Sequence, residues 1–450
     1  MEPKGEKKLN ILLGTHMFFP KYKAGTEVLT YELAQGLKSR GYNIWILTGE
    51  PEERIHYKAK PWITSDVYEG FTVYRLHYGT RQNAFLNHFD VPERIELIQN
   101  LIKTIKPDLV HFNHLIGLST KIIPIIREMG IPVIFTPTDY WAICPKVTLL
   151  RTFDQSLCDG PEDIVNCLRC FRHMPRYVAQ LLIKASQSSL KYIFPKLNAI
   201  NSLKKRQDVI INNINYANKI LPATFFLKER LIKYSIKQNK IEVVPYGVNI
   251  GFLPPKIPTP NFFTEKSPLR LGFIGTIAEL KGLHVIVEAL AYLGDDKQKI
   301  TLDIYGHFDE NDDYHQLLKM KVSAIGSSIN LKGTFTHDKI GEILRSFHFL
   351  IVPSIWFEDT PLVLCSALSA GIPVIVSKVG GMTEVVHEGI NGFSFPVGDS
   401  YSLSIIILEI LKNPPKLADI FKTDSFRKRS TMDYTLDIEN EYQKLLKSNN

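Results

Sequence analysis

The stretch NILLGTHMFFPKYKAGTEVLTYELAQGLKSRGYNIWIL, residues 10–47, decides the fold of this chain. A short apolar run opens it, and from about Thr26 leucine recurs every fourth residue, which is the spacing of an amphipathic helix. Gly41 ends that segment before a second apolar run, Ile44–Leu47. A strand, a helix and a strand in this order predict a βαβ unit, the building block of a parallel sheet.

The same alternation continues along the chain, stops, and then starts again. Five prolines between residues 254 and 268 form a segment that cannot continue a helix or a central strand. We therefore expect one domain over 1–253, a linker over 254–268, a second domain over 269–428, and a helix over 429–450 that packs back on the first domain. The predicted class is α/β, with two facing, doubly wound Rossmann-like domains and a ligand cleft between them.

The composition is that of a globular protein with a mild excess of positive charge. Apolar residues make up 44% of the 450 positions and charged residues 22%, which excludes disordered and fibrous classes. Fifty-four Lys and Arg against 46 Asp and Glu give a net charge of +8. The apolar run Leu9–Leu13 is too short for a secretory signal, and no stretch approaches the ~18 apolar residues of a membrane span. We expect a cytoplasmic protein.

Three loops of the C-terminal half follow expected strands and suit an anionic sugar ligand. The loop Gly275–Gly282 contains Lys281, whose ammonium can neutralise a diphosphate. Glu358 can accept hydrogen bonds from sugar hydroxyls, and a helix starting at Thr360–Pro361, with Thr360 as N-cap, offers N–H groups to a phosphate. At Gly380–Gly381 the backbone can approach a ligand closely. An ordinary strand-turn-helix with a solvated glutamate also accounts for the second of these loops.

Taken in order, the motifs of the whole chain resemble those of the retaining glycosyltransferase family four. The motifs are Phe19–Pro20, Ala24–Glu27, Val110–His114, Val244–Asn249, Gly275–Gly282, Pro353–Glu358, Ala370–Val374, Gly380–Gly381 and Asn391–Gly392. The resemblance implies the GT-B fold, with an acceptor held by the N-terminal domain and a nucleotide-diphosphate-sugar donor held by the C-terminal domain. It also implies transfer with retained anomeric configuration and no catalytic metal.

The resemblance assigns roles to single residues. Lys281 would bind the donor diphosphate, Glu358 the sugar hydroxyls, and His114 would be the family's histidine near the transferred sugar. His111 is the less favoured candidate for that histidine, and a single histidine at a strand end is more often structural. The other donor-binding positions would be Gly25, Gly275, Thr276, Thr360, Pro361, Leu362, Val363 and Ser366.

Two positions depart from the family's pattern. Thr276 stands where the family has an arginine, and Ser366 stands where it has a second glutamate that holds the ribose. Losing one charge-assisted hydrogen bond weakens binding by roughly 1.5–3 kcal/mol. We expect a hexosyltransferase-type enzyme that builds a cell-surface polysaccharide, lipopolysaccharide or lipid-linked glycan precursor. The alternatives are a sugar-nucleotide epimerase of the same fold and a catalytically silent sugar-nucleotide-binding partner subunit.

Four of the five cysteines fall within 27 positions, in an expected insert over about 141–171. They are Cys144, Cys158, Cys167 and Cys170. A Cys-x2-Cys pair with two flanking thiols suits one structural ion held by four sulfurs, with zinc favoured over an iron–sulfur cluster. The outer spacings of 13 and 8 residues are irregular for a zinc ribbon, so reduced cysteines without metal are the alternative. A subset of the family has a similar insert after a segment like Asp139–Trp141.

Residues 172–206 carry eight basic side chains and no acidic one, interleaved with apolar residues. The basic residues are Arg172, Arg176, Lys184, Lys191, Lys196, Lys204, Lys205 and Arg206. Anionic membranes attract such segments by about 1 kcal/mol per basic residue near the surface. We expect peripheral contact with the cytoplasmic face of a membrane; a solvated face or a channel for acceptor phosphates is the alternative. No nucleic-acid-binding module accompanies the charge.

Overall fold

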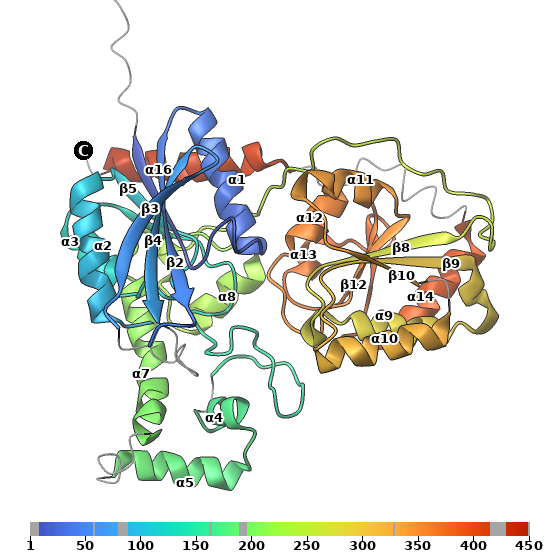
Figure 1. The fold of residues 1–450 in the computed structure, drawn as a ribbon, viewed down its shortest axis with the longest axis horizontal. Coiled ribbons are helices and arrows are strands. Elements are labelled where there is room, and N and C mark those ends of the chain that lie inside the picture. Colours follow the sequence, from blue (N-terminus) through green and yellow to red (C-terminus); the bar gives the residue numbers. More distant parts are fainter. Residues whose placement is uncertain are drawn as a thin grey trace, which may run out of the picture. The chain divides into compact units, whose positions relative to one another are not determined.

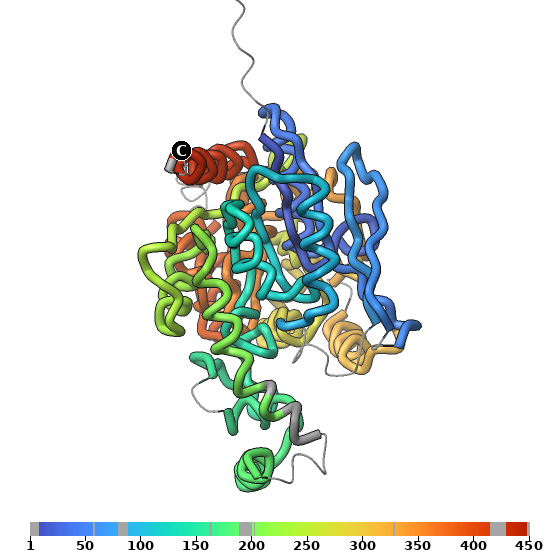
Figure 2. The backbone as a smooth tube through the Cα atoms, turned by 90° about the vertical axis from the view of Figure 1, so that its left-hand side faces the viewer, coloured from blue at the N-terminus to red at the C-terminus, as the bar shows by residue number. Residues whose placement is uncertain are grey.

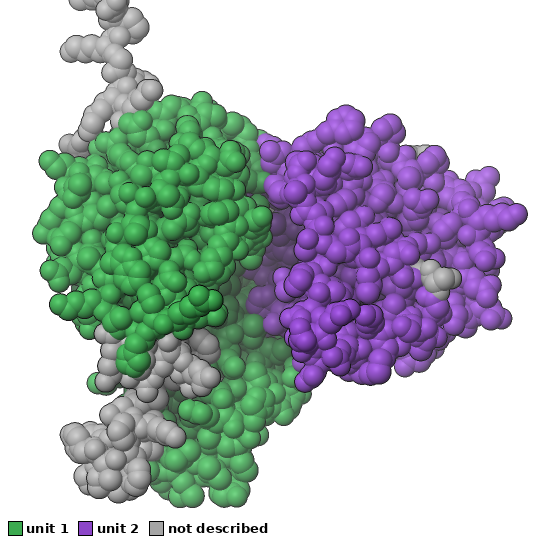
Figure 3. Space-filling model, viewed as in Figure 1, with its two compact units in different colours: residues 1–245, 431–450 green, residues 246–430 purple. Residues whose placement is uncertain are grey.

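The computed structural model describes residues 9–56, 59–79, 89–161, 164–188, 196–326, 329–414 and 429–448. The chain forms two compact units: residues 1–245 with 431–450, and residues 246–430 (Figure 3). Each unit is an α/β domain with its own doubly wound, largely parallel sheet, which confirms the predicted fold class. Within the described ranges, no helix is both long and apolar enough to cross a bilayer.

The sheet of the first unit has seven strands among the described residues, in the order β3-β4-β2-β1-β5-β6-β7. Neighbouring strands are parallel except β3 and β4. The strands are β1 (Asn10–Thr15), β2 (Asn43–Glu52), β3 (Trp62–Tyr68), β4 (Phe71–Gly79), β5 (Leu109–Phe112), β6 (Val133–Phe135) and β7 (Lys219–Ile220). The predicted βαβ unit is confirmed as β1, α1 (Gly25–Ser39) and β2.

Helices cover both faces of this sheet. The chain moves from β1 to β2 in one direction and later to β5 and β6 in the other, so right-handed crossovers place α1 on one face and α2 and α3 on the opposite face. The C-terminal helix α16 packs beside α1, where a Cβ on Gly36 would lie 2.1 Å from Thr435 Oγ1. The other helices of this unit are α2 (Pro92–Ile105), α3 (Ile122–Glu128), α4 (Ile164–Arg172), α5 (Arg176–Gln187), α7 (Lys196–Ile214), α8 (Phe225–Lys233) and α16 (Thr431–Ser448).

The helices α4, α5 and α7 extend away from the sheet of the first unit (Figure 1, Figure 2). They share a small apolar core built from Leu168, Ala179, Ile200 and Leu203. These three helices therefore have packing of their own, and the remaining face of α5 is exposed to solvent.

The second unit repeats the design with six strands in the described part, ordered β10-β9-β8-β11-β12-β13. The strands are β8 (Leu269–Ile274), β9 (Ile300–Tyr305), β10 (Ile329–Gly333), β11 (Phe349–Val352), β12 (Val374–Ser377) and β13 (Gly392–Phe395). The helices are α9 (Leu283–Ala291), α10 (Asp313–Ile325), α11 (Ile340–Arg345), α12 (Leu362–Ser369), α13 (Met382–Val385) and α14 (Ser400–Lys412). The proline-rich residues 254–268 belong to this unit, where the Phe263 side chain is buried.

Each sheet reverses its strand order next to its first strand. In the first unit β1 lies between β2 and β5, and in the second unit β8 lies between β9 and β11. The loops that leave two such neighbouring strands run to opposite faces, and ligands of doubly wound domains bind between them. The residues after β1 and β5, and those after β8 and β11, are therefore the first places to look for a site.

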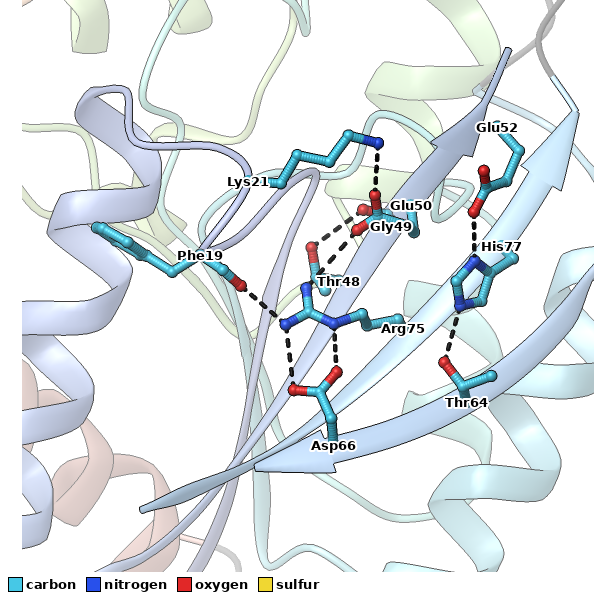
Figure 4. A network of polar contacts seen from close by, with 10 residues as sticks. All are labelled: Phe19, Lys21, Thr48, Gly49, Glu50, Glu52, Thr64, Asp66, Arg75 and His77. Atoms are coloured by element: carbon cyan, nitrogen blue, oxygen red, sulfur yellow. Dashed lines mark hydrogen bonds and ion pairs between the residues drawn. The ribbon is translucent and has the colours of Figure 1, made fainter. Parts of the chain in front are cut away.

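The loop between β1 and α1 is anchored to the edge of the first sheet by Arg75 (Figure 4). Arg75 on β4 pairs with Asp66 on β3, and its Nη2 donates to the Phe19 carbonyl at 2.8 Å. Lys21, in the same loop, pairs with Glu50 on β2 at 2.9 Å. These contacts hold the segment that follows β1, which contributes to the site of this unit.

Candidate active site

Lys281 and Glu358 meet at the reversal point of the second sheet, although they come from separate sequence motifs. Lys281 follows β8 and Glu358 follows β11, and Lys281 Nζ lies 2.6 Å from Glu358 Oε1. The same oxygen accepts hydrogen bonds from Ser354 Oγ at 2.8 Å and Trp356 Nε1 at 2.9 Å. The Glu358 side chain is 7% exposed and that of Lys281 29%. Lys281, Ser354 and Trp356 therefore all donate to one oxygen of this carboxylate, and the Lys281 ammonium group remains partly exposed.

Two glycines allow the loops around this pair to pack backbone against backbone. Gly282, with φ of 73°, has no room for a Cβ, which would lie 1.9 Å from the Pro353 carbonyl oxygen. A Cβ on Gly380, whose φ is 58°, would lie 2.2 Å from the Glu358 carbonyl oxygen, and the Gly381 N–H donates to that oxygen. The predicted approach of a ligand to Gly380–Gly381 stays a prediction; both glycines also pack against the backbone of the Glu358 loop.

The helix after Glu358 begins later than predicted. Pro361 has a ψ of 129°, which is not helical, so α12 starts at Leu362 and the prediction of Thr360 as N-cap is wrong. The N–H groups of Leu362 and Val363 stand at its first turn, where an α-helix leaves its donors unpaired. Ser366 is buried and its hydroxyl donates to the Leu362 carbonyl at 2.8 Å, so its proton is already engaged within the helix.

The remaining donor-loop positions lie at the end of β8. The Gly275 N–H donates to the Tyr305 carbonyl at 3.0 Å, and Thr276 is exposed beside it. Thr276 thus leaves space, but supplies no positive charge, at the position of the family's arginine. Gly25, the predicted phosphate-loop glycine of the N-terminal domain, is the first residue of α1.

His114 occupies the corresponding place in the first unit, directly beyond β5. Its Nε2 lies 3.1 Å from Asp139 Oδ2, and its Nδ1 accepts the Ile116 N–H at 3.1 Å. Because Nδ1 accepts, the ring proton is on Nε2 and faces Asp139. The Trp141 N–H also donates to Asp139, at 2.8 Å. Both nitrogens of His114 are therefore engaged, and one tautomer is fixed.

Three residues to which the sequence motifs assign no role lie around His114. They are Asp139, His16 and Glu27. The His16 and His114 ring centroids are 4.3 Å apart, and His16 Nε2 lies 3.4 Å from Glu27 Oε1. Burial, and then the nearby His114, lower the pKa of His16 to about 3, while burial raises the pKa of Glu27. Burial acts to raise the pKa of Asp139, but His114 and the Trp141 N–H together hold it below its usual value.

The less favoured histidine, His111, is a structural residue. It is fully buried on β5, with Nδ1 2.7 Å from the Tyr442 hydroxyl and Nε2 2.8 Å from Thr136 Oγ1. Burial lowers its pKa to about 3. Both ring nitrogens bind the protein interior, so His111 has no contact to offer a substrate.

The four cysteines of the predicted zinc site line one cavity of the first unit. As the side chains lie, however, no group of three or more His, Cys, Asp or Glu residues in the described part of the chain is arranged to hold a metal ion. Cys144 is buried and the other three are partly buried. The thiols are thus brought together without forming a completed metal centre.

The basic stretch does not form one continuous surface. Arg206 is 1% exposed and donates to the Trp141 carbonyl, so its assignment to a basic surface is wrong. Arg206 lies on the buried side of α7, and the charge pattern of the sequence does not distinguish the faces of that helix. Lys191 and the side chain of Lys196 lie outside the described residues. Arg172, Arg176, Lys184 and Lys205 are exposed.

Two family models match this chain over most of its length. Residues 24–252 match the model described as Glycosyltransferase Family 4, and residues 260–425 match the model described as Glycosyl transferases group 1. The protein is therefore a glycosyltransferase. More closely, the chain belongs to glycosyltransferase family 4, as the ordered motifs predicted.

Two relatives by sequence are bacterial proteins, from Klebsiella pneumoniae and Erwinia amylovora. An uncharacterized 42.6 kDa protein in the cps region of Klebsiella pneumoniae is 25% identical over 397 residues, covering 84% of this chain and 87% of the relative. The amylovoran biosynthesis glycosyltransferase AmsK of Erwinia amylovora is 25% identical over 198 residues, 42% of this chain and 47% of its own. This chain therefore matches about half the length of AmsK.

Solved structures share the fold. Sucrose-phosphate synthase from Thermosynechococcus elongatus is 16% identical with a TM-score of 0.69, over 98% of this chain and 100% of its own. The lipopolysaccharide outer core galactosyltransferase WaaB is 15% identical with a TM-score of 0.58, over 97% and 99% of the two chains. These likenesses confirm the predicted GT-B fold.

Proposed function

We propose that this glycosyltransferase moves a sugar, with retained anomeric configuration, from a nucleotide-diphosphate-sugar to a cell-surface polysaccharide, lipopolysaccharide or lipid-linked glycan precursor. The observation that carries the proposal is the Lys281–Glu358 pair, 2.6 Å apart at the reversal point of the second sheet. Lys281 supplies positive charge for a leaving diphosphate, and the oriented Glu358 carboxylate accepts sugar hydroxyls. The acceptor class is supported by the names of two relatives, a protein in a cps region and an amylovoran biosynthesis glycosyltransferase, and of one solved structure, a lipopolysaccharide outer core galactosyltransferase.

Retention is supported by the state of His114. Its Nδ1 already accepts the Ile116 N–H, and its Nε2 proton faces Asp139. Neither nitrogen has a lone pair left for the proton of an attacking hydroxyl, so His114 is a poor general base here. The proton passes instead to the departing diphosphate, on the same face of the sugar, and attack from that face retains the configuration. Lys281 and the first N–H groups of α12 then stabilise the leaving charge.

Calorimetric titration of the full chain with uridine, guanosine and adenosine diphosphates and their sugars tests this function. UDP-glucose comes first, because the related fold of Anabaena HepE was solved with it. We expect selective binding of one nucleotide sugar, and release of its nucleotide only when a glycan acceptor is added. Donor conversion without any acceptor would instead indicate an epimerase. No binding across the panel would mean that Thr276 and Ser366 have disabled the donor site, and would favour the silent partner subunit.

We also propose that α5 contacts the anionic surface of a membrane, which places the enzyme beside lipid-linked acceptors. Tyr177 and Leu181, one turn apart on this helix, are 65% and 62% exposed. Arg176 and Lys184 are exposed on the same helix, and the sequence from 172 to 206 has no acidic residue. Apolar side chains flanked by basic ones are typical of helices that lie in the membrane interface.

Cosedimentation with phosphatidylglycerol vesicles checks this contact. The Tyr177→Ser/Leu181→Ser variant should bind roughly tenfold more weakly than the unchanged chain, because it removes two apolar side chains that would enter the interface. The matched control is Leu317→Ser/Met320→Ser, which removes two exposed apolar side chains from α10 of the second unit. Equal binding by both variants, or equal binding to phosphatidylcholine vesicles, would contradict the proposal.

A further inference from the structure

The cavity of the first unit that contains the thiols has no role in the proposed transfer reaction. Its four cysteines come from separate segments: Cys144 from the loop after β6, Cys158 from the chain before α4, and Cys167 and Cys170 from α4 itself. Cys365 belongs to the second unit. Thiolate sulfur is a preferred ligand of zinc, and four of them complete a tetrahedral shell. The number and the chemistry of these side chains therefore match one soft metal ion.

The side chain of Arg206 provides an independent observation. It is 1% exposed; its Nη2 donates to the Trp141 carbonyl, while its Nε and Nη1 have no hydrogen-bond partner among the residues that the structure describes. Its acidic neighbours are Cys144, Cys167 and Asp139, and Asp139 is already bonded to His114 and to the Trp141 N–H. A buried guanidinium with two unpaired donors is costly unless negative charge lies nearby.

The charge of a metal–thiolate centre would offset the charge of the buried Arg206. Neutral thiols do not balance a guanidinium. Four thiolates on a divalent ion carry a net charge of −2, so a metal–thiolate centre that includes Cys144 and Cys167 would supply negative charge near Arg206.

We propose that Cys144, Cys158, Cys167 and Cys170 close on one zinc ion, with Arg206 as the balancing cation. Since the sulfurs are not arranged for a metal as they lie, binding requires them to move together; Cys158 Sγ, which donates to the Gly160 carbonyl at 3.3 Å, has to give up that bond. Each thiol that becomes a ligand releases its proton to solvent, and nothing is oxidised or reduced.

The centre would stabilise the loop beside His114. It links the chain after β6 to α4, and Arg206 holds the carbonyl of Trp141, whose ring lies 5.5 Å from the His114 ring. The role is structural, since the cysteines do not belong to the donor site or to the His114 cluster. Metal content and transfer activity therefore test separate statements.

Titration of the reduced, chelator-treated full chain with Co²⁺ tests the site. We expect one Co²⁺ per chain, with the thiolate-to-cobalt charge-transfer absorption and the visible bands of a tetrahedral site, both removed by one equivalent of Zn²⁺. Untreated protein should contain about one zinc per chain. Absence of thiolate–cobalt absorption would overturn the proposal, as would iron–sulfur absorption in the untreated protein.

Two cysteine variants locate the ion. Cys170→Ser removes a partly buried ligand and should weaken Co²⁺ binding by at least about tenfold to hundredfold. Cys365→Ser, the matched control in the second unit, should still bind one ion. Equal binding by the two variants would overturn the assignment. If Cys170→Ser does not fold, the titration of the unchanged chain decides the question.

Discussion

Glu358→Gln should lower the transfer rate by at least about a hundredfold, the effect of removing one preorganised charged partner from a reaction centre. The amide keeps the size of the side chain and can still accept from Ser354 and Trp356, so the loop keeps its shape. It cannot pair with Lys281 as a charge, and the sugar hydroxyls lose an ionised acceptor. We expect the unfolding free energy to fall by only about 1–2 kcal/mol.

The matched control is Glu279→Gln. Glu279 is an exposed carboxylate two positions before Lys281, in the same short 3-10 helix, Glu279–Lys281. The hydrogen bonds that orient Glu358 do not involve it. Steady-state kinetics with the donor found by calorimetry, together with thermal unfolding, should separate the two variants. Near-normal turnover of Glu358→Gln, or an equal loss in both variants, would contradict the assignment of Glu358.

The fold could be predicted because its signals are local. Apolar runs and leucines at helical spacing mark each strand and helix, and the strand-then-helix order alone requires parallel sheets. Lys281 and Glu358 could be found in the same way, because each follows a buried strand at a chain position that a parallel sheet brings to one edge. The start of α12 could not be predicted, because the sequence pattern does not specify the extended ψ of Pro361 that delays the helix to Leu362.

The rest of the site depends on contacts between segments distant in sequence. Asp139 faces His114 only because β5 and β6 are neighbours, and His16 lies against His114 because β1 pairs with β5. A survey of the polar residues that follow each strand would have found both. Arg206 is different: a basic residue in a basic segment gives no sign of burial, and only the packing of α7 against the chain around Trp141 shows it.

The role of Gly380 is also set by packing, and it leads to the second large effect. Gly380→Ala should lower the unfolding free energy by roughly 2–4 kcal/mol, from the left-handed backbone conformation and from the clash of a new Cβ. That Cβ would lie 2.2 Å from the Glu358 carbonyl oxygen, and backbone cannot rotate away as a flexible side chain can. The Glu358 loop must shift, so we expect transfer to fall at least about tenfold even in molecules that remain folded.

Gly389→Ala separates the two causes. Gly389 also has a positive φ, of 69°, in the same unit, but a Cβ there would meet nothing within 4 Å. This control carries the conformational cost of about 1–2 kcal/mol without the clash. We therefore expect its activity to stay normal and its unfolding free energy, measured by denaturant titration, to lie between those of the unchanged chain and Gly380→Ala. Identical behaviour of the two variants would show that the close approach of Gly380 to the Glu358 carbonyl contributes nothing to stability or activity.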